Sequence, residues 1–220
     1  MGGITTPSTY TTNWDSTCAL AYYELKGTPI IDVTSTDLIC RSPDMTDKRT
    51  PFAATAGEVV RVTWGAEGST TPLKGPCSFW LAKQSSGGVG ASWVKIHQYT
   101  NDGTDSNWCT DVIASKSPSK NSGSYDLTIP EGLASGLYIL RSEIIDITYA
   151  DKDPFDDYTM GARYYANCLV LNIQGDGSKP LSNPVNILSA YASLEKKPLL
   201  ASKGALTFTY PGPAPLSATA

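Results

Sequence analysis

The amino-acid sequence predicts an all-β protein in which two antiparallel sheets pack face to face, with long loops on the surface. Three observations support this fold class: short runs of β-branched and aromatic residues recur along the chain, Gly, Pro, Ser or Asp mostly bound them, and apolar and polar residues alternate within them. A chain of 220 residues suits one well-cored sandwich, so we expect a single domain over residues 1–220.

Seven runs are predicted to be strands. They are Ile30–Val33, Glu58–Trp64, Ser78–Ala82, Ser92–His97, Ser124–Ile129, Gly136–Ile147 and Cys168–Ile173. In the second run, Val60 and Val62 alternate with Arg61 and Thr63, as a half-buried strand requires. A short apolar stretch with helical spacing, Trp108 to Ala114, predicts one or two helical turns.

The C-terminal part of the chain, residues 176–220, is rich in Ser, Pro, Lys and Gly. It contains apolar islands at Val185–Leu188 and Leu206–Tyr210, which would be buried only against the rest of the protein. We therefore expect an extended C-terminal loop that wraps over the domain.

Composition narrows the class of partner. The net charge is −4, with 17 Lys and Arg against 21 Asp and Glu, which argues against a nucleic-acid or anionic-membrane partner. Only 17% of residues are charged, a profile common in secreted proteins that face neutral polymers such as carbohydrate. No apolar run is long enough to span a membrane, and Met1-Gly2-Gly3 is interpreted as an initiator with cloning residues ahead of a mature, monomeric protein.

Five cysteines lie far apart without a Cys-x-x-Cys pair, which disfavours zinc and favours disulfides formed in an oxidising compartment. We therefore expect a secreted, extracellular protein. One cysteine must remain unpaired. Cys77 and Cys109 stand in segments expected to be neighbours in the core, so a second disulfide and a pair of buried thiols both remain open.

Several segments together resemble the fungal lytic polysaccharide monooxygenases of auxiliary activity family nine, formerly glycoside hydrolase family 61. In chain order they are Asp32–Cys40, Lys74–Cys77 with Phe79–Ala82, Trp93–Ile96, Trp108–Ala114, Ile129–Pro130, Gly136–Arg141, Glu143–Ile145, Gly161–Cys168 and Tyr210–Ala214. The resemblance implies an immunoglobulin- or fibronectin-like sandwich with a flat polysaccharide-facing surface. It also implies a disulfide between Cys40 and Cys168.

In that family, copper is held by an N-terminal histidine, by a second histidine just before the Gly-Pro strand and by an axial tyrosine. The resemblance places Tyr165 at the tyrosine position and Leu73 at the second histidine, and the chain's sole histidine is His97. Thr148 and Arg163 stand where the family carries a histidine and a glutamine around the metal. An imidazole pair suits copper and cannot be assembled here, so we expect no bound metal and no copper cofactor.

The leading functional hypothesis is a non-catalytic protein that binds cellulose or another β-glucan of the cell wall. Flat aromatic rings stack on sugar faces, and the expected binding residues are Tyr10, Trp14, Tyr22, Tyr191 and Tyr210. One alternative is an enzyme with an unorthodox copper site built from Tyr165 and the N-terminal amine. Another is a structural or host-interaction protein.

Four other candidates are interpreted as structural. His97 is expected to be exposed or to cap a strand, and Ser142 lacks a nucleophile motif and a nearby histidine. The four carboxylates of Asp151–Asp157 lack the spacing of a calcium loop. Glu143 is the best-placed acid for glycoside hydrolysis, but its position in the family favours a structural role.

Overall fold

The structure, a computed structural model, describes residues 2–5, 29–41, 50–65, 73–86, 92–116, 122–152, 161–194, 199–200, 202, 205–207 and 209–216. The strands within these residues are β1 (Gly2–Thr5), β2 (Phe52–Thr55), β3 (Val59–Gly65), β4 (Cys77–Lys83), β5 (Val94–Tyr99), β6 (Ser122–Thr128), β7 (Ala134–Tyr149) and β8 (Gly161–Asp176). The helices are α1 (Asp37–Cys40), α2 (Cys109–Ser115) and α3 (Ile187–Tyr191), with 3-10 turns η2 (Gln84–Ser86) and η3 (Ala192–Leu194).

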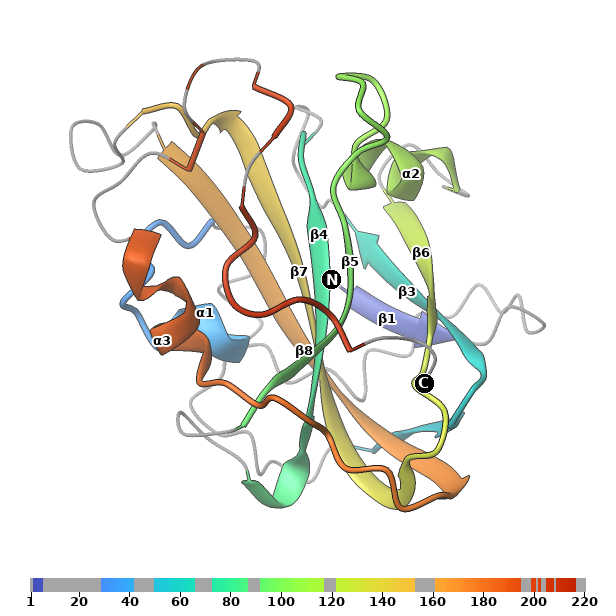
Figure 1. The fold of residues 1–220 in the computed structure, drawn as a ribbon. Helices are drawn as coiled ribbons and strands as arrows, with labels where there is room; N and C mark the ends of the chain where they lie inside the picture. The colour runs from blue at the N-terminus through green and yellow to red at the C-terminus, as the bar shows by residue number, and fades with distance from the viewer. Residues whose placement is uncertain are drawn as a thin grey trace.

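The described strands form two sheets. One has the order β1-β3-β6 and the other the order β2-β8-β7-β4-β5. Neighbouring strands are antiparallel except β2, which runs parallel to β8. Figure 1 shows the three-stranded sheet on one side of the five-stranded sheet, and α1 and α3 on the other. The predicted β-sandwich is confirmed.

Six of the seven predicted strands correspond to β3 through β8, and the predicted helical turns correspond to α2. The exception is Ile30–Val33, where the structure has only an isolated antiparallel bridge from Ile30 to Tyr164. Its backbone turns directly afterwards, because Asp32 accepts hydrogen bonds from the amide and the hydroxyl of Thr34.

The interior of the sandwich is an apolar core between the two sheets. Val60 and Val62 of β3 are fully buried and pack there with Phe79, Leu127 and other side chains from both sheets. The alternation in the sequence predicts this face correctly, because successive side chains of a strand point to opposite sides.

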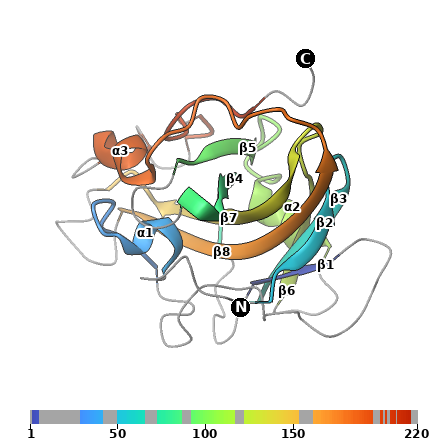
Figure 2. The same ribbon diagram turned by 90° about the horizontal axis from the view of Figure 1, so that it is seen from below.

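The outer face of the five-stranded sheet carries a second apolar core beneath α1, α3 and the C-terminal segment (Figure 2). Trp80 and Trp93 are fully buried there. The segment is fixed along β5 by a bridge between Trp93 and Val185 and by a hydrogen bond of 2.7 Å from the amide of Leu216 to the carbonyl of Lys95. The described parts of the tail therefore lie over the sheet, and they include α3, a helix that the sequence did not predict.

Two disulfides join distant segments. Cys40 at the end of α1 is bonded to Cys168 of β8, and Cys77 at the start of β4 is bonded to Cys109 of α2. The first pairing confirms the disulfide that the resemblance implies. The second shows that Cys77 and Cys109 form a disulfide and are not a pair of buried thiols. Cys18 lies outside the described residues. No described helix has the length and apolar composition needed to cross a bilayer.

Candidate functional site

The four residues that the resemblance places around a metal come together at one end of the five-stranded sheet. Hydrogen bonds from the amides of Ile145 and Ile147 to the carbonyls of Pro76 and Lys74, at 3.0 and 2.8 Å, continue the pairing of β4 with β7 toward Leu73.

Thr148 lies on β7 itself. On the other side of β7, strand β8 carries the other two residues, Arg163 and Tyr165. Arg163 lies opposite Asp146, and Tyr165 lies opposite Ile144. Leu73 and Tyr165 both pack against the core between the sheets, so they share the inner face of this sheet. We call Leu73, Asp146, Thr148, Arg163 and Tyr165 the rim cluster.

Asp146 organises the rim cluster. Its side chain is 1% exposed and forms an ion pair of 2.6 Å with Arg163 through Oδ2 and Nη2. Its other oxygen, Oδ1, accepts hydrogen bonds from the hydroxyl of Thr148 at 2.6 Å and from the Thr148 amide at 3.1 Å. Thr148 and Arg163 are thus linked through one buried carboxylate. The sequence analysis missed Asp146, although an acid inside an apolar strand such as Ile144–Ile147 signals a buried partner.

Tyr165 is half-buried beside this ion pair. Desolvation raises the pKa of its hydroxyl and outweighs the opposing effect of the nearby Arg163 guanidinium; Asp146 adds to the rise and Arg41 opposes it. The phenol is therefore protonated at neutral pH.

The chain's sole histidine lies elsewhere. His97 is on β5, which β4 and β7 separate from β8 in the sheet order. Its Nε2 is 2.8 Å from the hydroxyl of Tyr125, and its ring is tilted against Phe79 and Tyr125. Desolvation lowers the pKa of His97. The expected exposed or capping role is therefore wrong: His97 is a half-buried side chain that joins the two sheets.

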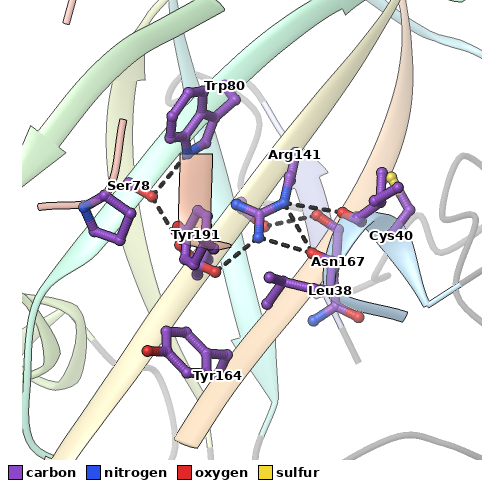
Figure 3. A network of polar contacts seen from close by, with 12 residues as sticks. Leu38, Cys40, Ser78, Trp80, Arg141, Tyr164, Asn167 and Tyr191 are labelled. Atoms are coloured by element: carbon purple, nitrogen blue, oxygen red, sulfur yellow. Dashed lines mark hydrogen bonds and ion pairs between the residues drawn. The ribbon is translucent and has the colours of Figure 1, made fainter. Parts of the chain in front are cut away.

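A buried polar network lies on the opposite face of the five-stranded sheet, and Figure 3 shows Ser78, Arg141 and Tyr191 within it. Glu143 is at its centre. It is fully buried and pairs with Arg141 through Oε1 and Nη2 at 2.7 Å. Its Oε2 accepts hydrogen bonds from the hydroxyl of Ser78 at 3.1 Å and from that of Tyr191. Arg141 also donates to the carbonyls of Leu38 and Ile39 in α1.

A carboxylate closed off in this way cannot reach a polymer, so a glycosidase role for Glu143 is excluded. Ser142 is also buried and donates to the carbonyl of Asn167 at 3.4 Å, consistent with a structural strand serine. The loop with four carboxylates lies mostly outside the described residues. Among the residues that the structure describes, no three His, Cys, Asp or Glu side chains lie close enough together to hold a metal ion.

The predicted sugar-stacking role of Tyr191 and Tyr210 is wrong. Tyr191, the last residue of α3, is fully buried, and its hydroxyl donates a hydrogen bond to Glu143. Tyr210 is 8% exposed and donates to the carbonyls of Cys77 and Tyr99 at 2.6 and 3.0 Å. Both hydroxyls find buried partners, so each ring packs in the outer core rather than facing solvent. Tyr10, Trp14 and Tyr22 lie outside the described residues.

The fold and the rim cluster together define the class of protein. It is a two-sheet β-sandwich with polar side chains at one end of the adjacent strands β8, β7 and β4. The sequence model of auxiliary activity family 9, formerly GH61, matches residues 2–205. The chain belongs to this family.

Curated relatives include the AA9 family lytic polysaccharide monooxygenase A of Aspergillus flavus, which is 30% identical over 84% of this chain and 49% of its own length. The AA9 family lytic polysaccharide monooxygenase C of Thermothelomyces thermophilus is 31% identical over 74% of this chain and 70% of its own. The chain spans about half the length of the first of these relatives.

Solved structures agree on the fold. CvAA9A superposes with a TM-score of 0.73 at 24% identity, covering 88% of this chain and 87% of the other. The extended catalytic domain of H. jecorina LPMO9A superposes with a TM-score of 0.71 at 22% identity, covering 98% and 89%.

The resemblance to this family implies a copper ion at the rim, and the described side chains there do not suit one. Leu73 has no lone pair, and the guanidinium of Arg163 is a cation held next to the phenol of Tyr165. Copper prefers imidazole and amine nitrogen, yet the only imidazole in the sequence is on β5. Among the described side chains of the rim cluster, the phenol of Tyr165 is protonated and the Asp146 carboxylate is already bound by Arg163 and Thr148.

Proposed function

We propose that this protein binds a cell-wall polysaccharide and does not carry out copper-dependent oxidation. One observation carries the proposal: the rim of the sandwich holds an ion pair between Asp146 and Arg163 and an alkyl side chain at Leu73. Both oxygens of the Asp146 carboxylate are already bound, one by Arg163 and one by Thr148, and Leu73 offers no ligand in place of an imidazole.

Cellulose or another β-glucan is the proposed polymer. The relatives named above are called lytic polysaccharide monooxygenases, and this chain shares their fold. A neutral polymer also suits a chain in which 17% of residues are charged. We further propose that the protein is extracellular, since its two disulfides are typical of an oxidising compartment. A monomeric state remains a prediction.

Copper titration tests the negative half of the proposal. Isothermal titration of the full-length protein with its native N-terminus should show no one-to-one, sub-micromolar binding of Cu(II). Incubation with amorphous cellulose, a reductant and peroxide should release no soluble oxidised oligosaccharides. Tight stoichiometric copper binding or oxidised products would instead support the alternative enzyme, in which the retained Tyr165 and the N-terminal amine take part in a metal site.

Co-sedimentation tests the positive half. The protein should pellet with amorphous cellulose or with another insoluble β-glucan, and bovine serum albumin should stay in solution as the control. If the protein remains soluble with every insoluble polysaccharide tried, the third hypothesis, a structural or host-interaction protein with a protein partner, replaces the first.

A further inference from the structure

An exposed aromatic ring stands next to the rim cluster. The large exposed apolar side chains in the described part of the chain are Val59, Leu137 and Tyr149, and Tyr149 is the aromatic one among them. Its ring is 38% exposed, whereas Tyr191 and Tyr210 are buried. From this ring and its neighbours we propose a sugar-binding subsite, formed by Tyr149, Arg163 and Thr148 and held in place by the buried Asp146, that takes a neutral hexose unit of a polysaccharide.

An irregularity in β7 places Tyr149 on the same face as the rim cluster. Asp146 pairs with Arg163, but Tyr149 pairs with Gly161, so the register shifts by one residue between them. In a regular strand, residues three apart point to opposite faces. Here the partners of Asp146 and Tyr149 are two residues apart in β8, so the irregularity turns Tyr149 toward the Arg163 side.

The ring is held by a chain of contacts that begins in the core. The guanidinium carbon of Arg163 lies 5.7 Å from the centre of the Tyr149 ring, within the range of a cation–π contact. Arg163 is in turn fixed by the buried carboxylate of Asp146, which Thr148 also anchors. A ring fixed in this way loses little conformational freedom when a ligand stacks on it.

The charges of the subsite select the class of ligand. Asp146 offsets the charge of Arg163, so the pair has no net charge to attract an acidic sugar. The exposed part of the Tyr149 ring offers an apolar surface for the C–H face of a hexose, and the part-exposed Arg163 and Thr148 can hydrogen bond to hydroxyls beside it. This pattern of one ring and adjacent polar groups fits a neutral sugar.

This inference rests on the proposed polysaccharide binding, and two measurements separate them. Co-sedimentation with amorphous cellulose measures the polymer binding. Titration of soluble cellohexaose, followed by NMR of protein with 13C-labelled tyrosine rings, reports on the subsite itself. The Tyr149→Phe variant lacks one tyrosine signal and thereby assigns it, while keeping the ring available for stacking.

Four proteins are compared: the wild type, Tyr149→Ala, Tyr149→Phe and Leu137→Ala. Leu137 is the matched control, since it is an exposed apolar side chain at the other end of the same strand. We expect cellohexaose to shift the Tyr149 signal. Tyr149→Ala should weaken binding to cellulose by about tenfold, as loss of a buried aromatic contact does. Tyr149→Phe and Leu137→Ala should bind within about twofold of the wild type.

Each other outcome has a defined meaning. If the wild type binds cellulose and Tyr149→Ala binds equally well, the subsite is refuted while the proposed function stands. If the wild type stays off cellulose but cellohexaose shifts the Tyr149 signal, the subsite stands and polymer binding is refuted. If the wild type stays off cellulose and cellohexaose leaves the Tyr149 signal unchanged, both the subsite and the proposed polymer binding are refuted.

Discussion

Breaking the Arg141–Glu143 pair should destabilise the protein strongly, because both side chains are fully buried. In Glu143→Leu, the guanidinium of Arg141 keeps the carbonyls of α1 and the side chain of Tyr191 but loses its carboxylate partner. Removing one partner of a buried pair costs about 3–5 kcal/mol, which for a domain of this size lowers Tm by roughly 6–20 °C. Thermal and urea unfolding, followed by tryptophan fluorescence, measure both quantities.

The double variant Arg141→Met/Glu143→Leu shows whether the two side chains act together. Its loss of unfolding free energy should be about 2 kcal/mol smaller than the sum of the losses of the two single variants. The reason is that each single variant leaves one buried charge without its partner, whereas the double variant removes both charges. The matched control is Lys74→Ala, which removes an exposed ion pair with Asp105 and should leave the unfolding curve unchanged. Additive single effects, or a Glu143→Leu variant as stable as the wild type, would refute this account of the network.

Three further predictions concern pH and the disulfides. Burial lowers the pKa of Lys95 to about 8, so between pH 8 and about 10 the unfolded chain binds more protons, and the wild type should gain stability over Lys95→Met as the pH rises. Burial also lowers the pKa of His97, so the wild type should lose stability relative to His97→Gln as the pH falls below about 6.5. Replacing Cys40 and Cys168 by serine should cost up to about 5 kcal/mol, roughly 1 kcal/mol more than opening the shorter loop of the second disulfide, as urea titration can test.

Much of the sheet could be predicted from the sequence because alternation reports directly on a strand with one buried face. The predictions of β3 and β6 succeeded for this reason, as the burial of Val60 and Leu127 shows. The strand β2 and the helices α1 and α3 are four or five residues long, too short for a period to appear. Their positions are set by contacts between distant segments.

The rim cluster was predicted in part. The resemblance identified Leu73, Thr148, Arg163 and Tyr165, and the structure brings them to one end of the sheet. The carboxylate that links two of them was missed, because a single acid in a strand does not reveal its partner.

The aromatic residues show where sequence reasoning fails. Tyr191 and Tyr210 were expected to bind sugar because flat rings stack on sugar faces, but packing against the sheet buries both. Tyr149 was overlooked for a different reason. Simple alternation places it on the face opposite Asp146, and only the shift of register in β7 reverses this.

The Asp146–Arg163 pair also sets the order in which mutations are tolerated. Replacing Arg163 first would leave Asp146, 1% exposed, without its cation, at a cost of about 1.5–3 kcal/mol. Replacing Asp146 first is milder, because the 25% exposed guanidinium of Arg163 can turn toward water. A lineage of this protein that moves by single mutations toward an imidazole at position 73 should therefore lose the aspartate before the arginine, and the opposite order should be rare.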